Sequence, residues 1–100
     1  ETVWITMRDN PTPAQVRQEF LNFNPNLGDL PTEPEQVLIV REEADRPQPR
    51  LDRNMGNGMS ISVGRIREGI RYVLMGHNTI RGAAGASVLN AELLHKQGKL

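Results

Sequence analysis

The chain has 100 residues, with 12 basic and 12 acidic side chains and no net charge at pH 7. This length supports a single domain, and the balanced charge disfavours a nucleic-acid-binding module, which usually carries a basic excess. The chain contains no cysteine, which excludes a disulfide, a thiolate metal site and a cysteine nucleophile within these residues. No apolar run approaches the roughly 20 residues of a membrane span, so we expect a soluble, cytoplasmic protein without a membrane partner.

The first 25 residues predict a strand followed by a helix. Residues 2–7 alternate between two faces, as a half-buried strand does. A helix should follow, because Thr12 can cap it, Pro13 suits its first turn and Gln15 completes a capping box. Its apolar stripe recurs at helical spacing and should pack on a sheet: Val16, Phe20 and Phe23. Because the chain enters a strand at its second residue without an initial methionine, it is either a piece of a longer protein or a product trimmed of a tag.

The middle of the chain predicts two loops around one short strand. Prolines and a glycine punctuate residues 25–36, which should form a loop. The continuous apolar run 37–40 predicts a strand buried on both faces. Residues 41–58 predict a long polar loop that is either a surface excursion or the lining of an interface or site. The arginines of this loop and of residues 59–68 after it could form an anion-binding patch, while interleaved acidic residues favour internal ion pairs at least as much: Arg46, Arg50, Arg53, Arg65 and Arg67 against Glu42, Glu43, Asp45, Asp52 and Glu68.

Residues 59–75 predict a β-hairpin. Residues 59–66 alternate, with apolar side chains opposite Ser60 and Ser62, and a turn at Glu68 and Gly69 leads into a strand over 70–75. The order β-α-β-β-β-α predicts an α+β fold in which helices cover one side of an antiparallel or mixed sheet.

The segment from Gly76 to Leu94 predicts a polar turn and then a helix that is apolar almost all round. One face carries Ile80, Ala83, Ala84, Ser87, Ala91 and Leu94, and the opposite face carries Gly82, Ala86, Leu89 and Leu93. A helix without a polar face is normally an interior helix. Since a domain of this size has difficulty surrounding a helix, we expect a second layer of protein against it.

The candidate site residues are His77, Asn78, Thr79 and Arg81, where the last strand meets this helix. A helix start suits a phosphate or an amide carbonyl, and the Asn78 carboxamide could pair with another carboxamide. Alternatively, Asn78 or Thr79 simply caps the helix.

The other polar candidates favour structural roles. His77 lacks a nearby nucleophile or paired carboxylate, and His95 lies with two lysines near a helix C-terminus, where cations are favourable. No spacing indicates a metal site. The glycines of residues 56–64 predict a turn and not a nucleotide-binding loop.

Three stretches carry a resemblance to a known family. "MGNGMSISVGRIR" (55–67) and "HNTIRGAAGASVLNAELL" (77–94) resemble the C-terminal end of aspartate-semialdehyde dehydrogenases of the archaeal and fungal-like branch. "PQPRLDRNMGNG" (47–58) is similar to the same family's loop, and "ETVWITM" (1–7) also fits. Between Pro11 and Arg46 the similarity is only general.

The resemblance implies a fold like the C-terminal catalytic and dimerisation domain of the glyceraldehyde-phosphate dehydrogenase superfamily. Residues 1–75 would then be part of that domain, and residues 76–100 would be a cofactor-proximal turn and a helix returning to a Rossmann domain. Asn78 matches the amide that the family places beside the nicotinamide carboxamide, and Gly82 and Ala83 match the small residues beside the cofactor, NADP. No catalytic residue of the family falls within the chain.

The implied activity is the NADPH-dependent conversion of aspartyl phosphate to aspartate semialdehyde, on the route to lysine, methionine and threonine. The isolated chain should be inactive, because the family's cysteine and histidine lie outside it. The implied partners are the N-terminal Rossmann and catalytic portion and further copies in a dimer or tetramer. Two alternatives stay open: a non-enzymatic dimerisation domain, and a relative of N-acetyl-glutamyl-phosphate reductase, which residues 77–94 make the weaker match.

Overall fold

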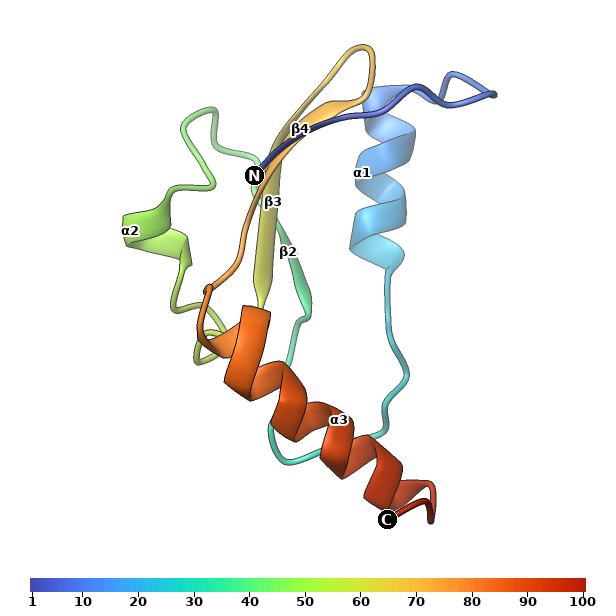
Figure 1. The fold of residues 1–100 in the computed structure, drawn as a ribbon. Helices are drawn as coiled ribbons and strands as arrows, with labels where there is room; N and C mark the ends of the chain where they lie inside the picture. The colour runs from blue at the N-terminus through green and yellow to red at the C-terminus, as the bar shows by residue number, and fades with distance from the viewer.

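In a computed structural model that describes residues 1–100, the chain folds around one mixed sheet with strand order β1-β4-β3-β2 (Figure 1). The strands are β1 (Thr2–Trp4), β2 (Leu38–Val40), β3 (Ile61–Arg67) and β4 (Arg71–Met75). The helices are α1 (Pro13–Asn22), the short α2 (Pro49–Asp52), a π-helical turn η1 (Ile80–Ala84) and α3 (Gly85–Lys96). The α+β class is confirmed.

The sheet is antiparallel at two of its junctions and parallel at the third. β3 and β4 form the predicted hairpin, and β1 pairs antiparallel with β4. Of the two sheets that the sequence allows, antiparallel or mixed, the mixed one is confirmed, because β2 runs parallel to β3. Parallel strands need a crossover of a dozen or more residues. Residues 41–60 supply that crossover, which explains why the chain carries so long a connection.

Both outer strands differ from their predictions. β1 ends at Trp4 and not at Met7, although the Ile5 N–H still donates to the Ile70 carbonyl at 3.0 Å. The chain then turns away through Asn10, whose positive φ of 42° is compatible with a turn. β2 is half-buried and not buried on both faces, because it forms an edge of the sheet.

α1 covers one face of the sheet, as the sequence predicts (Figure 1). Its capping box is present: Thr12 Oγ1 accepts from the Gln15 N–H at 3.2 Å, and Gln15 Oε1 accepts from the Thr12 N–H at 2.8 Å. Phe20 meets Tyr72 of β4 edge to face, with ring centroids 5.3 Å apart. Phe23 does not join the stripe: it is 53% exposed, because the backbone is already extended there ahead of Pro25.

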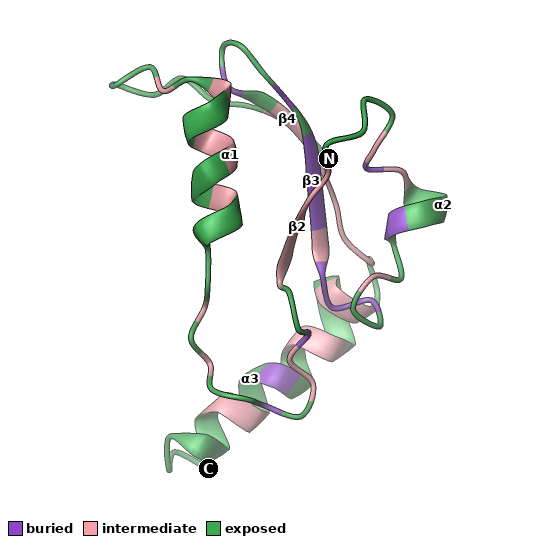
Figure 2. Cartoon of the chain, turned by 180° about the vertical axis from the view of Figure 1, so that it is seen from behind, coloured by how far each residue is buried: buried purple, intermediate pink, exposed green.

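The crossover covers the second face of the sheet. The sheet is therefore covered on both sides, and not on one side as the sequence predicts. Gly64 of β3 lies directly against the backbone of Arg46 and against Pro47. Ser60 and Ser62 are almost completely buried, although alternation alone predicts a half-buried strand. Figure 2 shows most of β3 as buried. The crossover also contains α2, where the sequence predicts only loop.

α3 lies beyond the end of the strands and is held mainly by the loop of residues 25–36 (Figure 1). Leu30 and Met59 pack against Leu89 on its inner face. Glu92 accepts hydrogen bonds from the Thr32 backbone and hydroxyl at 3.0 and 2.8 Å. The Lys96 ammonium donates to the carbonyls of two loop residues, Leu27 and Gly28.

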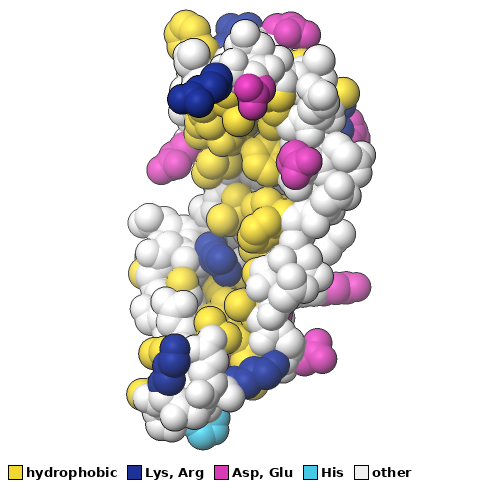
Figure 3. Space-filling view, turned by 90° about the vertical axis from the view of Figure 1, so that its right-hand side faces the viewer, with side chains coloured by type: hydrophobic (Ala, Val, Ile, Leu, Met, Phe, Trp, Pro, Cys, Tyr) yellow, Lys and Arg dark blue, Asp and Glu magenta, His cyan; other side chains and the backbone are white.

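Much apolar surface stays uncovered. Val88 and Leu94 of α3 are 48% and 40% exposed, and Trp4 is 78% exposed. Hydrophobic side chains also gather along the length of the face shown in Figure 3. The accessible surface is 6932 Å², against about 5,700 Å² for a globular monomer of this mass. No helix has the length and apolar character needed to cross a membrane.

Candidate functional site

The segment between β4 and α3 forms a π-helical turn. The Gly82 N–H donates to the His77 carbonyl and the Ala84 N–H to the Thr79 carbonyl, each at 3.0 Å and each spanning five residues. The Gly85 N–H continues the pattern to the Ile80 carbonyl. Single π-helical turns are rare and often mark functional sites. The sequence predicts a helix here but gives no sign of this wider turn.

His77 begins the turn, and neither Asn78 nor Thr79 caps it. The His77 Nδ1 atom accepts the Ile80 N–H at 3.3 Å and lies 3.3 Å from the Thr79 hydroxyl. Side-chain capping by Asn78 or Thr79 is therefore wrong: Thr79 stands at the N-cap position, but neither side chain accepts a backbone N–H of the turn, and the Ile80 N–H goes to the imidazole. The structural hydrogen bond predicted for His77 is confirmed. Asn78 keeps its amide available, since its exposed side chain bonds to nothing within the chain.

The three predicted site residues, Asn78, Gly82 and Ala83, are all exposed in the segment that contains this turn, and Gly82 lies next to Asn78. A methyl group on Gly82 would stand 3.6 Å from the His77 carbonyl oxygen and 3.9 Å from Asn78 Oδ1, so a side chain as small as that of alanine meets the protein there only at ordinary contact distances. An unpartnered carboxamide beside small exposed residues fits a planar ring that bears an amide, because one donor and one acceptor are presented together.

The inner side of the turn rests on the end of the crossover. A methyl group on Gly58 would stand only 2.8 Å from Ile80 Cδ1. On Gly85 it would overlap the Met59 sulfur and stand 2.9 Å from Ile80 Cγ2. These approaches require the absence of a side chain at both glycines. An open cleft of about 710 Å³ lies next to this contact, between the start of α3 and residues 31–35.

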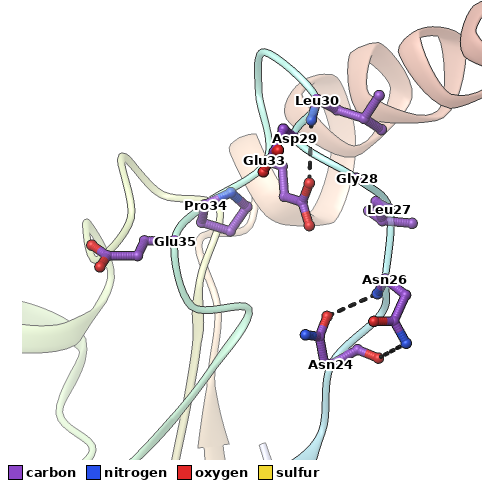
Figure 4. A pocket seen from close by; sticks show the side chains of 9 residues that line it. All are labelled: Asn24, Asn26, Leu27, Gly28, Asp29, Leu30, Glu33, Pro34 and Glu35. Carbon is purple, nitrogen blue, oxygen red and sulfur yellow. Dashed lines mark hydrogen bonds between the residues drawn. The ribbon is translucent and has the colours of Figure 1, made fainter.

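A second cleft, of about 620 Å³, lies along the loop of residues 24–35 (Figure 4). Its polar groups bond mostly to one another: Asn24 Oδ1 accepts the Asn26 N–H at 2.8 Å, and Glu33 Oε2 accepts the Leu30 N–H at 3.2 Å. In Figure 4 the Glu35 carboxylate lies apart from that of Glu33. No group of His, Cys, Asp and Glu side chains in the chain could hold a metal ion.

Asp52, at the end of α2, is the most deeply buried charged residue. Its Oδ1 atom accepts from Arg41 Nε at 2.9 Å and Arg46 Nη2 at 2.7 Å, and its Oδ2 atom accepts from Arg46 Nε at 2.9 Å and the Gln48 N–H at 2.7 Å. The Ser62 hydroxyl of β3 lies 3.4 Å from Asp52 Oδ1. Internal ion pairing is thus confirmed for Arg46. The pairing of Arg41, which directly follows β2, with Asp52 was not predicted from the sequence.

These contacts stabilise the ionised carboxylate. The side-chain hydrogen bonds from Arg46, opposed by burial, lower the pKa of Asp52 from 3.8 to about 2, and the Gln48 N–H and Arg41 assist. The same hydrogen bond raises the pKa of Arg46 above its ordinary value.

Stability should therefore fall in acid through Asp52. Because the folded pKa of Asp52 lies below the unfolded one, its contribution is complete above about pH 5 and is lost as the pH falls through 4 towards 2. Urea unfolding should show wild type more stable than Asp52→Asn at pH 7, with the gap narrowing below pH 4. A gap that is constant from pH 7 to pH 2.5 would contradict this assignment.

Known proteins resemble the chain along nearly its whole length. The semialdehyde dehydrogenase dimerisation domain matches residues 1–81. The aspartate-semialdehyde dehydrogenase of Archaeoglobus fulgidus is 55% identical over 97% of the chain and 29% of its own length. A malonyl CoA reductase (NADP) of Metallosphaera sedula is 41% identical over 98% of the chain and 30% of its own length.

A solved structure extends the similarity to the fold. The aspartate semialdehyde dehydrogenase of Candida albicans, crystallised with NADP, superposes with a TM-score of 0.79 at 38% identity. The alignment covers 97% of this chain and 29% of that one. The chain thus spans somewhat under a third of the length of its relatives. On this match the chain belongs to the semialdehyde dehydrogenase dimerisation-domain family.

Proposed function

We propose that the chain is the C-terminal part of an NADP-dependent aspartate-semialdehyde dehydrogenase. The 55% identity to the Archaeoglobus fulgidus enzyme carries this proposal. The activity is the reductive dephosphorylation of aspartyl phosphate to aspartate semialdehyde, a biosynthetic step of lysine, methionine and threonine that we place in the cytoplasm. The chain lacks cysteine, so the nucleophile of this reaction comes from the remainder of the enzyme.

Within that enzyme, residues 76–100 hold the nicotinamide end of the cofactor. Asn78 would hold the nicotinamide carboxamide with its free amide, while Gly82 and Ala83 would leave room for the ring. The cofactor, when bound, would supply the hydride for the reduction. The exposed positions of Gly82 and Ala83 and the unpartnered Asn78 amide support this role. The chain's own task is to orient the ring, and a fixed orientation lowers the entropic part of the barrier.

The remaining exposed surface serves two protein partners. The outer face of α3 packs on the N-terminal Rossmann and catalytic portion, which is the second layer that a helix with little polar surface needs. Residues 1–75 contribute to contacts between subunits of a dimer or tetramer, in keeping with the dimerisation family. The surface excess over a compact monomer supports both contacts.

A second activity has one specific observation in its favour. The malonyl CoA reductase of Metallosphaera sedula matches 98% of the chain. Reduction of an acyl thioester uses the same cofactor surface but a different acyl donor. Oxidation of NADPH by the full-length enzyme, driven in turn by aspartyl phosphate and by malonyl-CoA, separates the two. Turnover of malonyl-CoA alone would replace the proposed substrate, and turnover of neither would leave a non-enzymatic dimerisation domain.

Removing the Asn78 amide should impair cofactor placement in the full-length enzyme. Asn78→Ala loses a pair of hydrogen bonds and should cost on the order of 1–3 kcal/mol in kcat/KM for NADPH. Asn90→Ala is the matched control, because Asn90 is also exposed but lies further along α3. Equal kinetics for the two variants would remove Asn78 from the site.

Gly82→Ala tests the same site without disturbing the fold. The new methyl group meets the protein only at ordinary contact distances, 3.6 and 3.9 Å, so thermal stability should be unchanged. Affinity for NADP should nevertheless fall, because the methyl group occupies the space assigned to the ring. Titration of NADP by fluorescence measures this affinity, and an unaltered value would place the cofactor elsewhere.

A further inference from the structure

We propose that Asp52 is a positioning residue for the turn of residues 77–85: through the crossover it holds the surface on which Asn78 lies. The inference rests on the proposed function for the role of the turn, although the mechanical link between Asp52 and the turn stands on the contacts alone. Asp52 itself would touch neither substrate nor cofactor.

The first link is the attachment of the crossover to the sheet. Asp52 is fully buried and joins two arginines from the start of the crossover to the end of α2. Its neighbour Ser62 belongs to β3, so the cluster ties α2 to the central strand. The backbone of Arg46 is seated on Gly64 of the same strand. When a carboxylate that pairs with two guanidinium groups is removed, both positive charges are left without their counter-charge.

The second link is a continuous set of backbone hydrogen bonds from Asp52 to Ser60. The Met55 N–H donates to the Asp52 carbonyl at 3.2 Å, and the Gly58 N–H donates to the Asn54 and Met55 carbonyls at 3.2 and 3.1 Å. The Ser60 N–H donates to the Met55 carbonyl at 3.1 Å. With these bonds in place, residues 52–60 move as one unit.

The third link is the contact of that unit with the turn. Gly58 and Met59 meet Ile80 and Gly85 so closely that no side chain fits on either glycine. Met59 also packs with Leu30 and Leu89, which ties α3 to the same residue of the crossover. A shift of residues 52–60 is therefore transmitted to Ile80 and to the surface formed by Asn78 and Gly82.

Hydrogen–deuterium exchange of the full-length enzyme tests the link without relying on activity. In Asp52→Asn, amides of residues 41–60 and of residues 77–86 should both exchange about tenfold faster or more, while those of α1 stay unchanged. Asp45→Asn is the matched control: Asp45 lies in the same crossover and is exposed, and its carboxylate accepts a hydrogen bond only from Gln48 Nε2. It should leave residues 77–86 unaffected.

Two outcomes would overturn the proposal. Faster exchange confined to residues 41–60 would mean that the cluster supports only its own segment, and equally faster exchange in α1 would mean a general loss of stability. In the assay with NADPH, Asp52→Asn should lower kcat by up to roughly 100-fold with a much smaller change in KM. If wild type does not bind NADP, the proposed function fails, whereas the exchange result still decides the link.

Discussion

Replacing Gly64 by alanine should destabilise the domain by roughly 1 to 3 kcal/mol, although the change adds only one methyl group. The methyl group would stand 2.6 Å from the Arg46 carbonyl oxygen, 3.1 Å from Pro47 Cδ and 3.2 Å from Arg41 Cβ. The nearest of these is a backbone atom, which cannot turn aside as a flexible side chain does. The crossover must therefore lift away from β3.

That displacement should also disturb the Asp52 cluster, because Arg41 and Arg46 reach Asp52 from the segment that lifts. Urea unfolding of the two single variants and of Gly64→Ala/Asp52→Asn measures the connection. We expect the double variant to lose less than the sum of the single losses, since both disrupt one interaction.

Gly76→Ala is the control for Gly64→Ala. Both glycines have ordinary backbone angles, but a methyl group on Gly76 would stand 3.6 Å from Ile61 Cγ1, which is normal contact. Its unfolding free energy should stay near that of wild type. Equal losses in the two variants would mean that glycine entropy, and not the crowding over Gly64, sets the effect.

Features set by neighbouring residues could be predicted from the sequence. The capping box of Thr12 and Gln15 needs only four consecutive residues, and it is present as predicted. The hairpin of β3 and β4 follows from alternation around a glycine turn, and it is also present. In each case the determining contacts lie within a few positions, so the local pattern contains the information.

Features set by distant segments could not be predicted in this way. Parallel pairing of β2 with β3 depends on where the crossover lies. The burial of Ser60 and Ser62 depends on that crossover covering their face. Arg41 joins Asp52 across 11 positions, and no periodicity marks such a pair.

The candidate site could be predicted only in part from the residues themselves. The resemblance identified Asn78, Gly82 and Ala83 together, and the fold leaves all three exposed, with Gly82 next to Asn78; their contact with a cofactor stays a prediction. The π-helical turn that contains Gly82 and Ala83 carries no sequence signature, since its wider hydrogen bonds use the same small residues as an α-helix. His77 as the acceptor for Ile80 depends on a ring orientation that the sequence does not encode locally.

The 100-residue chain on its own should self-associate and show no dehydrogenase activity. Its accessible surface exceeds the expectation for a compact monomer by about 1,200 Å². A stable interface covers about 800 Å² on each partner, so the excess is of the size that an interface removes. Sedimentation should show species larger than 11.2 kDa that grow with concentration.

The outer face of α3 is the part of this surface that one substitution can test. Val88→Glu places a charge on a side chain that is 48% exposed, and glutamate favours a helix more than valine does. We expect this variant to be smaller in sedimentation than wild type at equal concentration. Leu100→Glu is the matched control, because Leu100 is 71% exposed at the chain end, outside α3. A wild-type chain that sediments as a single monomer would show that these faces need no partner, and α3 would then be stable with only its inner side covered.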